Sequence, residues 1–495
     1  MIMDLVELFF EIVYPIFPLF HQPSYIRRIS RAEYNLDTSL FSVTMAVCAL
    51  VSARVRDGAV FNPRWDVHRL QDPQPEVYYH EAVRQLSGEP FRSDVNTLRA
   101  HAILALAAIQ DCKVREMHGH LGRYHTIVAT AGLHDEANWP RTAGVVEIEE
   151  RRRLFWSIYT LDIFTSIVWG GVIRSREYQS NVSYPIEADD DMFDDSGFAN
   201  TDVPLGTLGL STSPGSGPPS AQSVSWMAGR NFVIDLYRVM EHILMRLSAQ
   251  KSRAQRQTLA DGVLRISDSL SQEAVLDSVM QMYANLPQCL KATNPITSRP
   301  RMDRFGFQAA DIIATVQLLR MVLLSATGAS ISEKCQIANE VVNAFIAIPT
   351  AYHHAISVPL LFHLGVIGQI LATTLEQRLS EKDYSSIRDV MMAMVHLLST
   401  LEGLHASKGA SQRLREQITR VDEYMTLQRR NTRTQHGRSA LITSTSQYVP
   451  EASQEMPPSA FRSGAIDEML GTSPFHLPSE LLGDFSQIFD FSHLP

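Results

Sequence analysis

The spacing of the apolar residues is the feature that most restricts the fold of this chain. Near the N-terminus, Leu5, Leu8, Phe9 and Ile12 recur every three or four positions, and residues 98–109 repeat this spacing. Because an α-helix turns once in about 3.6 residues, apolar residues spaced in this way line one of its faces. No run alternates apolar and polar residues between paired turn signals, which is the pattern of a half-buried strand. The spacing therefore predicts an all-α, multi-helix fold.

Two changes of composition divide the chain into four parts. Residues 189–223 gather acids, glycines, prolines and serines, and the residues from about 431 onward are rich in Ser, Thr, Gln and Pro. Neither stretch offers enough apolar surface to offset the entropy that ordering would cost. We therefore expect a helical half over 1–188, a flexible insert over 189–223, a second helical half over 224–430 and a disordered tail over 431–495. The two halves form either two layers around one core or two adjoining subdomains.

The charge of the chain argues against nucleic-acid binding by these residues alone. The formal net charge is -9 and the pI is near 6.0, so no global positive field attracts the phosphate backbone. The four cysteines lie far apart in the sequence, which leaves no CxxC pair or other tight metal-ligand spacing. We expect four small, buried thiols in a reducing compartment: Cys48, Cys112, Cys289 and Cys335.

Two apolar stretches resemble membrane segments in composition, and both are better explained as buried helices. Residues 1–20 carry Asp4, Glu7 and Glu11, and they have neither the basic start nor the small-residue cleavage site of a signal peptide. Residues 341–374 have no formal charge, but they contain two prolines and three histidines. A lipid-facing helix rarely tolerates so many polar groups and helix breakers. We expect no contact with a membrane.

Two blocks of the first half combine helical segments with characteristic turns. Residues 8–25 read LFFEIVYPIFPLFHQPSY, an aromatic helix that leads into a proline-rich turn. Residues 97–110 and 124–136 form a pair of helical segments that ends in AGLHDE. The positions that carry these patterns are Pro15, Phe17, Pro18, His21, Pro23 and Tyr25 in the first block and Gly132, Leu133 and His134 in the second.

The third block, residues 150–191, is the longest and most specific. It begins with ERRRLFWSIYTLDIF and continues through a glycine turn and an extended piece to a proline and an acidic run. The fourth block, residues 284–290, reads ANLPQCL. The key positions are Arg152, Arg153, Phe155, Trp156, Asp162, Gly170 and Pro185 in the third block and Leu286 and Pro287 in the fourth.

In order and content, these four blocks resemble the fungal-specific transcription factor domain, the middle homology region of many fungal zinc-cluster regulators. The likeness covers about residues 5–400, and one of residues 279–282 stands where the family has a tryptophan. The resemblance implies a helical regulatory domain in a nuclear protein. It also implies coactivator or repressor proteins as partners, a homo- or heterodimer, and a small-molecule effector.

Members of this family usually carry six cysteines that bind two zinc ions, and this sequence does not contain that pattern. Without those thiolates no zinc cluster can place a helix in the major groove. We therefore expect no zinc or other cofactor on this chain. DNA contact is expected only through a module missing from this sequence or through a partner.

Charged residues in the third block need an explanation of their own. Glu147 precedes Arg151 by four residues and Glu149 precedes Arg153 by four, the order that favours ion pairs along a helix. We expect these arginines to form a solvated, charged helix face with a structural role rather than a phosphate contact. Asp162 lies within an apolar run and must find a partner if it is buried. We expect a buried ion pair or a helix cap there, and a role in a ligand pocket is the alternative.

Other polar clusters do not match known sites. His118, His120 and His125 have only Glu116 nearby to complete a metal site, and the acids in 187–195 lack the spacing of an EF-hand. We expect the three histidines to bind no metal and the acids in 187–195 to form a solvated loop. The sequence also lacks a G-x-S-x-G elbow, a phosphate-binding P-loop and a G-x-G-x-x-G turn. We therefore predict that the protein is not an enzyme.

The end of the chain, residues 466–495, contains five acids and neither lysine nor arginine. Acidic residues keep neighbouring apolar side chains accessible, so such a segment can fold as an amphipathic helix in a coactivator groove. The alternative is a helix that docks on the body of the same protein. The two interpretations are compatible if the body masks an activation segment until a signal arrives. The predicted activation segment rests on Leu481, Leu482, Phe485, Ile488, Phe489 and Phe491.

These features predict a fungal transcription regulator, an activator of a metabolic or secondary-metabolite gene set. It would act through its helical domain and its acidic tail. One alternative is a corepressor or dimerisation partner without DNA contact. A helical metabolite-binding protein or enzyme is the other.

Overall fold

Helices build both halves of the chain, which confirms the all-α prediction. The computed structural model describes residues 1–88, 92–198, 224–255, 272–297, 299–326, 330–375, 379–401, 409–443 and 477. The helices of the first half are α1 (Ile2–Ile12), α2 (Gln22–Ser30), α3 (Thr38–Arg56), α4 (Val67–Leu70), α5 (Pro75–Leu86), α6 (Val95–Gln110), α7 (Val114–Thr130) and α8 (Val145–Trp169). Those of the second half are α9 (Met227–Gln255), α11 (Gln272–Asn285), α12 (Pro300–Ala326), α13 (Ile331–Ile346), α14 (Thr350–Ile356), α15 (Val358–Leu375), α16 (Glu381–Thr400) and α17 (Ala410–Thr443).

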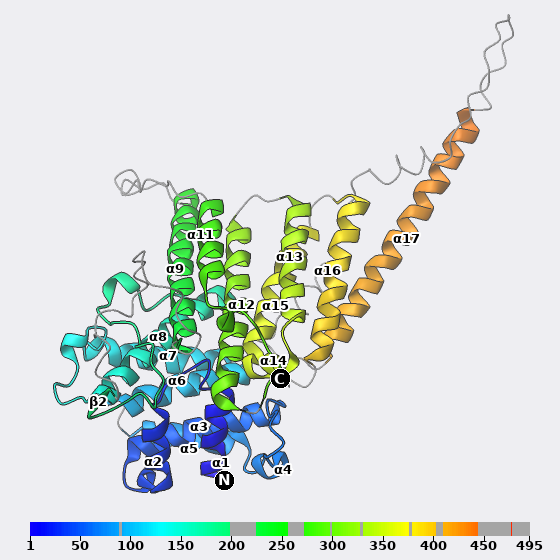
Figure 1. Cartoon of the computed structure of the whole chain (residues 1–495). Helices are drawn as coiled ribbons and strands as arrows, with labels where there is room; N and C mark the ends of the chain where they lie inside the picture. Colours follow the sequence, from blue (N-terminus) through cyan, green and yellow to red (C-terminus); the bar gives the residue numbers. More distant parts are fainter. Residues whose placement is uncertain are drawn as a thin grey trace, which may run out of the picture.

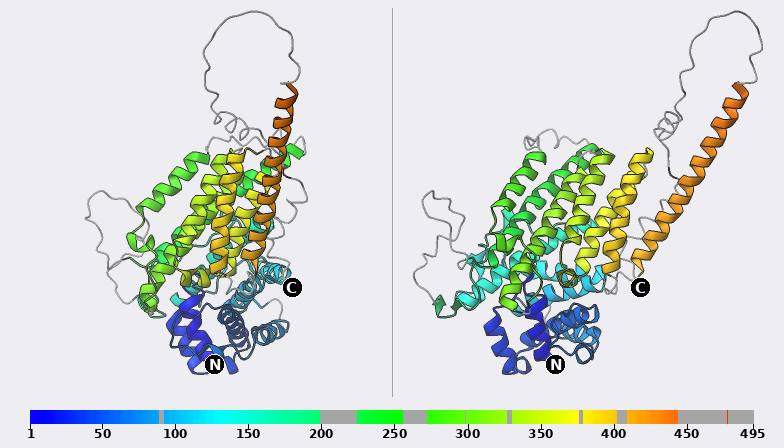
Figure 2. Two further views of the ribbon diagram at one scale, coloured as in Figure 1. Left: turned by 90° about the vertical axis from the view of Figure 1, so that its right-hand side faces the viewer. Right: turned by 45° about the vertical axis from the view of Figure 1, so that its right-hand side comes forward.

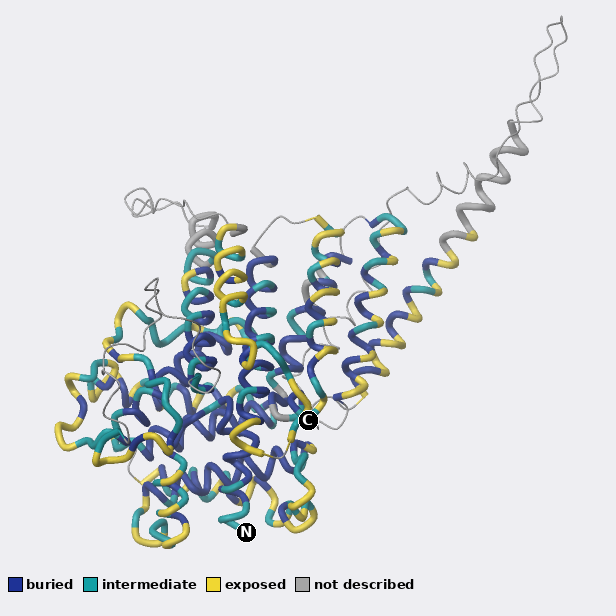
Figure 3. Tube along the Cα trace, viewed as in Figure 1, coloured by how far each residue is buried: buried dark blue, intermediate teal, exposed yellow. Residues whose placement is uncertain are grey.

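The first half is organised around α3 and α6, whose residues are buried on nearly all sides. α3 packs against α1, α5 and α6, and α6 packs against α7 and α8. Each of the two central helices begins after an aspartate, Asp37 or Asp94, whose carboxylate accepts hydrogen bonds from the free backbone N–H groups of the first turn. Figure 3 shows the result as a buried centre surrounded by exposed outer loops.

The long helices of the second half stand side by side as a layer above the first half (Figures 1 and 2). α9 packs on α12, α12 on α13, α13 on α16 and α16 on α17. A capping box begins α16: the Ser380 hydroxyl accepts a hydrogen bond from the Asp383 backbone N–H, and the Asp383 carboxylate accepts one from the Ser380 backbone N–H. α15 contacts α12, α13 and α16 in this layer and α6 and α8 in the first half, so it joins the two.

One hydrophobic cluster runs through both halves, from Leu5 in α1 to Met425 in α17. Close packing of α9 on α12 depends on Gly229. A Cβ atom at this position would lie 2.9 Å from a side-chain atom of Leu290 and 3.0 Å from one of Gln308. Because such distances are shorter than ordinary packing contacts, glycine allows the approach that a larger residue would prevent. The two halves therefore share one core.

The structure corrects the extent of the two stretches that composition marked as unstructured. Residues 189–198 are ordered and form an antiparallel pair of short strands, β1 (Phe193–Asp194) and β2 (Gly197–Phe198). α17 continues to Thr443, beyond the predicted boundary at 430. Composition misses the order of residues 189–198 because Asp190 is held by contacts to residues distant in the sequence. The rest of the predicted insert, 199–223, and of the tail, apart from residue 477, lies outside the described residues.

Two helices, α3 and α12, are long and apolar enough to cross a membrane. Within the body, however, 89% and 78% of their apolar windows are buried, as expected for core helices. The predicted buried helices of residues 341–374 correspond to the end of α13, α14 and most of α15. Three thiols are buried as expected, but Cys289 is exposed because it lies in the short turn η4 (Gln288–Leu290) at the surface.

Candidate functional site

The first and third sequence blocks meet at one buried carboxylate, Asp190, which precedes β1. Its Oδ1 accepts a hydrogen bond from Arg153 Nη1 at 2.6 Å. Its Oδ2 accepts one from the Tyr14 hydroxyl at 2.5 Å and one from the Gln22 backbone N–H at 2.7 Å. The side chain of Asp190 is 4% exposed and that of Arg153 is 1% exposed. Segments from both ends of the first half are therefore tied to a single charged group, which we call the Asp190 clamp.

The pKa values of the clamp show that its charges are matched. Burial alone would raise the pKa of Asp190, but the charge of Arg153 and the hydrogen bonds from Gln22 and Tyr14 outweigh burial and lower it. Burial would likewise lower the pKa of Arg153, and Asp190 outweighs it and raises this pKa. A buried ion pair persists when its desolvation is compensated by geometry and further hydrogen bonds. The carboxylate of Asp190 meets this condition with three donors, whereas Nε and Nη2 of Arg153 have no hydrogen-bond partner among the described residues.

His21 extends the clamp toward α8. Its Nε2 donates a hydrogen bond to the backbone carbonyl of Asp190 at 2.7 Å, and its backbone N–H donates to Glu150 at 2.7 Å. Glu150 in turn pairs with Arg99 of α6 at 2.5 Å. Pro23, which is exposed, starts α2, where its fixed φ suits the first turn of a helix. The proline-rich turn thus positions the polar groups that join α1, α6 and α8.

The other residues of the first block pack the turn against the second half. The carbonyl of Pro15 accepts a hydrogen bond from the Gln308 side chain of α12. Pro18 is buried, and Phe17 lies under the Arg230 guanidinium of α9 with 5.9 Å between the guanidinium carbon and the ring centroid. This block therefore connects both layers.

Asp162 on α8 forms a second buried pair, as expected from its place in an apolar run. Its side chain is 0% exposed and accepts a hydrogen bond from Arg174 Nη1 at 2.6 Å. The backbone N–H groups of Arg174 and Ser175 also donate to Asp162. Burial would raise the pKa of Asp162, but His125 and Arg174 outweigh it and lower this pKa. The pair fixes the chain just after α8.

The three histidines of α7 lie beside polar side chains of other segments. Arg174 Nη2 donates to His118 Nδ1 at 3.0 Å, and burial together with the charge of Arg174 lowers the pKa of His118. His120 is hydrogen-bonded to the Tyr79 hydroxyl at 2.8 Å, and burial lowers its pKa to about 4. His125 lies 3.6 Å from Asp162. Within the part of the chain that the structure describes, no group of three His, Cys, Asp or Glu residues could hold a metal ion.

The expectation of a solvated arginine face on α8 is wrong. Arg151 and Arg153 are 7% and 1% exposed, because the chain after α8 folds back over this face. The Ser183 carbonyl accepts a hydrogen bond from the Trp156 indole N–H at 2.9 Å, and the Ile186 backbone N–H donates to α8 as well. The expected solvated acidic loop is likewise wrong for Asp190, which supplies the partner of Arg153.

The ion pairs along α8 follow the predicted pattern only in part. Arg151 pairs with Glu147 at 2.6 Å, as the four-residue spacing predicts. Glu149 instead pairs with Arg152 at 2.7 Å. Arg152 also forms a bidentate pair with Glu136 at 2.8 and 2.9 Å. Because Arg153 turns inward to the clamp, Glu149 is free to take a different partner.

The glycines of the signature end two helices. Gly132 follows α7 with a φ of 66° and Gly170 ends α8 with a φ of 68°, left-handed values that glycine adopts without steric cost. Leu133 is buried, and its carbonyl accepts a hydrogen bond from the Trp139 indole. His134 is exposed, and its backbone carbonyl accepts a hydrogen bond from the Asn181 N–H at 2.8 Å.

The remaining signature residues are structural. Phe155 and Trp156 are buried in the core. The Pro185 carbonyl accepts a hydrogen bond from Asn231 of α9 at 3.0 Å. Leu286 packs against the core at the end of α11, and Pro287 is exposed at the start of η4. The fourth block therefore lies away from the clamp, and the structure does not bring all four blocks to one place.

Several residues of the clamp are absent from the sequence-based prediction, namely Tyr14, Gln22, Glu150, Asp190 and, at the second pair, Arg174. A signal for them exists, because the charges of Arg153 and Asp162 inside an apolar helix require partners. The sequence offers several acids near 190, however, and does not single one out. The predicted activation segment, from Leu481 to Phe491, lies outside the described residues.

The described residues form a helical body in which buried ion pairs, such as Arg153–Asp190 and Arg174–Asp162, join segments that are distant in the sequence. Residues 6–286, more than half of the chain, match the fungal specific transcription factor domain. The protein therefore belongs to the family of fungal transcription factors that contain this domain. The members of this family are transcription factors, not enzymes.

Two relatives carry names that describe activators. The chain is 29% identical over 157 residues to Activator of stress genes 1 of Saccharomyces cerevisiae, a match over 30% of this chain and 16% of that protein. It is 24% identical over 205 residues to Transcriptional activator protein acu-15 of Neurospora crassa, over 39% of this chain and 20% of that protein. The chain thus matches at most a fifth of the length of these relatives. No solved structure matches it.

Proposed function

We propose that this protein activates transcription in the nucleus of a fungus through its acidic tail, while its helical body serves as the regulatory domain. The observation that carries this proposal is the combination of a fungal transcription factor domain with a segment, residues 466–495, that has five acids and neither lysine nor arginine. The names of the two relatives support an activating rather than a repressing role. A coactivator protein is the expected partner of the tail.

The body also contacts the chain within residues 466–495, just before the apolar residues on which the predicted activation segment rests. Leu477 is 6% exposed and belongs to the hydrophobic cluster that joins the two halves. It precedes Leu481 by four residues. A body that holds the chain at this point limits the access of a coactivator to the residues that follow. Release of the tail then requires a ligand or partner that binds the state with a free tail more tightly than the state with a held tail.

A reporter assay tests the activating role. The full chain is fused to an unrelated DNA-binding domain, and output is compared with that of a variant in which Phe485, Phe489 and Phe491 are changed to alanine. We expect output to fall at least about tenfold, because aromatic anchors supply much of the affinity of such a helix for its groove. Phe461→Ala, in the same tail but outside residues 466–495, is the matched control and should leave output unchanged.

A second variant separates masking from activation. Leu477→Asp places a charge in the hydrophobic cluster and should release the tail, so reporter output should rise. Background output from both the full chain and the Leu477→Asp fusion would remove the activating role. Lowered output from an otherwise active promoter would favour the corepressor alternative.

A further inference from the structure

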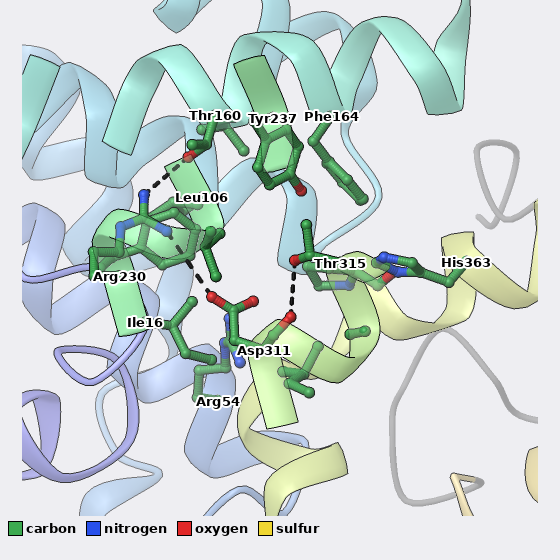
Figure 4. Close-up of a pocket in the computed structure, with 16 residues that line it drawn as sticks. Ile16, Arg54, Leu106, Thr160, Phe164, Arg230, Tyr237, Asp311, Thr315 and His363 are labelled. Atoms are coloured by element: carbon green, nitrogen blue, oxygen red, sulfur yellow. Dashed lines mark hydrogen bonds and ion pairs between the residues drawn. The ribbon is translucent and has the colours of Figure 1, made fainter. Parts of the chain in front are cut away.

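A cavity of about 60 Å³ lies where helices of both halves converge. Its walls come from the turn after α1, from α3, α6 and α8 of the first half and from α9, α12, α14 and α15 of the second. Figure 4 shows that Arg230 of α9 and Asp311 of α12 face each other at one side of it, with Thr160 of α8 beside Arg230. None of these three residues belongs to the Asp190 clamp, so the cavity is a separate site.

The opposite charges of Arg230 and Asp311 meet only loosely. Their closest nitrogen and oxygen atoms are 3.9 Å apart, beyond hydrogen-bonding distance. Arg230 Nη2 donates instead to the Thr160 hydroxyl at 2.9 Å, and Asp311 Oδ2 accepts no hydrogen bond from any described residue. The side chain of Asp311 is 16% exposed, whereas that of Arg230 is 3% exposed, so part of the aspartate faces open space. A guanidinium and a carboxylate thus lie close together without satisfying each other.

The pKa values agree with this loose pairing. Burial lowers the pKa of Arg230 despite the charge of Asp311, and it raises the pKa of Asp311 to about 6 despite the charge of Arg230. A tight ion pair shifts both pKa values the other way, as it does at Arg153 and Asp190. Each partner in the cavity therefore compensates the burial of the other only in part.

The other polar groups that line the cavity are engaged elsewhere. Arg54 of α3 lies near Asp57, whose charge stabilises the charged form of the guanidinium. The Thr315 hydroxyl donates to the backbone carbonyl of Asp311 at 2.8 Å. His363 is hydrogen-bonded to a backbone carbonyl of its own helix at 2.7 Å, and burial lowers its pKa to about 4, so the ring is neutral near pH 7. Open hydrogen-bonding capacity is therefore clearest at the loose pair.

Charges of both signs at one side of the cavity select against a charged ligand. An anion attracted by Arg230 would also meet the carboxylate of Asp311, and a cation attracted by Asp311 would meet the guanidinium. A neutral hydroxyl avoids both conflicts, because it can accept a hydrogen bond from the guanidinium and donate one to the carboxylate. Atoms 3.9 Å apart are close enough for one hydroxyl oxygen to lie within hydrogen-bonding distance of both.

Size and the remaining wall restrict the rest of the ligand. A buried water needs roughly 10–15 Å³ of such space, so the cavity accommodates about four or five non-hydrogen atoms. Most of the other lining residues are apolar, among them Phe164, Val233 and Ala314, each about one turn after a polar residue of the same helix. Water molecules beside these side chains would lack the polar partners that buried water needs. A short alkyl group that follows a single hydroxyl fits this wall better.

We propose that this cavity binds a small, uncharged alcohol, whose hydroxyl bridges Arg230 and Asp311 and whose short alkyl group packs against apolar residues such as Phe164, Val233 and Ala314. The site goes beyond the proposed function, since binding here does not depend on whether the tail activates transcription. A ligand at this position contacts helices of both layers. Its binding stabilises the packing of one layer on the other, because a ligand that binds only the folded arrangement favours that arrangement by mass action.

The test is a set of ligand-observed NMR titrations of the full chain at about pH 8, where the Asp311 carboxyl group is ionised. The four probes share one size and one branched shape: 2-propanol donates and accepts, acetone only accepts, acetate is an anion and isopropylammonium is a cation. We expect a millimolar Kd for 2-propanol, since so few atoms supply little binding energy. The other three should bind at least about fivefold more weakly, because each leaves Asp311 or Arg230 without a partner.

Two outcomes of these titrations would overturn the proposal. No binding of 2-propanol would mean that the cavity holds only water. Acetone, acetate or isopropylammonium bound as tightly as 2-propanol would mean that the hydroxyl does not bridge the loose pair.

Two variants then locate the site. Ala314→Val fills the cavity while it keeps every charge, and it should weaken 2-propanol binding at least about tenfold. Asp311→Asn replaces the carboxylate by an amide that can also donate to acetone, so the preference for 2-propanol over acetone should fall below about twofold. Asp191→Asn, the matched control, makes the same substitution at an exposed position and should change neither affinity.

Circular dichroism verifies the fold of each variant. Unchanged 2-propanol affinity in folded Ala314→Val, or an unchanged preference over acetone in folded Asp311→Asn, places the binding elsewhere and rejects this site.

Discussion

Two of the buried pairs of arginine and aspartate in the described residues, Arg153–Asp190 and Arg230–Asp311, have the same chemistry but differ in geometry. Arg153 and Asp190 lie 2.6 Å apart, and two further donors complete the aspartate. Arg230 and Asp311 lie 3.9 Å apart, and one oxygen of the aspartate accepts no hydrogen bond from the described residues. The pKa of Asp190 is lowered, whereas the pKa of Asp311 is raised to about 6.

The difference teaches that burial of a charge does not by itself reveal its role. Where several hydrogen bonds match the charge of a buried carboxylate, as at Asp190, burial is compensated at that carboxylate even though Nε and Nη2 of Arg153 have no hydrogen-bond partner among the described residues. Where hydrogen bonds do not match the charge, the protein carries an electrostatic cost that a ligand can relieve. The Asp190 clamp belongs to the first kind and the cavity around Asp311 to the second.

Loss of the Asp190 charge should have the largest effect on stability. Asp190→Asn leaves Arg153 buried without its counter-ion, so we expect the free energy of unfolding to fall by about 3–5 kcal/mol. Urea denaturation at pH 7 measures this loss. The matched control is Asp191→Asn, because Asp191 is 44% exposed and pairs with exposed Arg301, and its loss should cost less than about 1 kcal/mol.

The pH dependence of this variant provides a second check. The pKa of Asp190 is lower in the folded than in the unfolded state, so its contribution is present above about pH 4 and disappears as the pH falls through the folded value. The stability gap between the wild type and Asp190→Asn should therefore narrow in acid. A stability difference between the wild type and Asp190→Asn that stays constant down to pH 2 would show that the pKa of Asp190 is not lowered by folding. The contrast between Asp190 and Asp311 would then be lost.

Asp311→Asn should show the opposite dependence on pH, with a smaller effect. Burial raises the pKa of Asp311 from 3.8 to about 6, so ionisation destabilises the folded state as the pH rises through this window. Arg54, Arg230, Tyr237 and neutral His363 line the same cavity. Relative to the variant, the wild type should lose up to about 3 kcal/mol between pH 4 and pH 6 and no more above it.

Urea denaturation across this pH range, without added alcohol, measures the Asp311 effect. A stability difference that grows with pH supports the raised pKa. A difference that shrinks with pH would mean that Asp311 is as well compensated as Asp190, and the contrast between the two sites would be lost.

The smallest expected effects come from removing a tyrosine hydroxyl beside each site. The loss of stability should again be larger at Asp190 than at Asp311. Tyr14→Phe removes a hydrogen bond to a buried carboxylate, and we expect a loss of about 2 kcal/mol. Tyr237→Phe, in the wall of the cavity, removes an interaction with the neutral Thr315 and should cost less than about 1 kcal/mol. Thermal unfolding of the two variants side by side makes this comparison, and equal losses would contradict it.

Much of the architecture could be predicted because its signals are local. The spacing of Leu5, Leu8, Phe9 and Ile12 depends only on the period of a helix, and all four are buried in α1. The turn residues Gly132 and Gly170 likewise occupy the left-handed conformations that their chemistry favours. The order of the sequence blocks was sufficient for the family, which the comparison over residues 6–286 shows.

The sites were harder to predict because their partners are distant in sequence. The three arginines of α8 follow acids at helical spacing, and this local pattern favoured a solvated face. In the fold, Arg153 turns instead to Asp190, which is supplied by a segment that looked unstructured. The cavity left no trace in the sequence, since Arg54, Arg230 and Asp311 lie on three helices without a shared motif.

The sequence by itself determined that the chain is helical, that it carries the domain of a fungal transcription factor, and that Asp162 needs a buried partner. Each conclusion follows from periodicity, from the order of short motifs or from the cost of burying a single charge. Only the tertiary structure decided which arginine meets which aspartate and at what distance. Electrostatic compensation depends on distance, burial and hydrogen bonds in three dimensions, and these separate the closed clamp at Asp190 from the open site at Asp311.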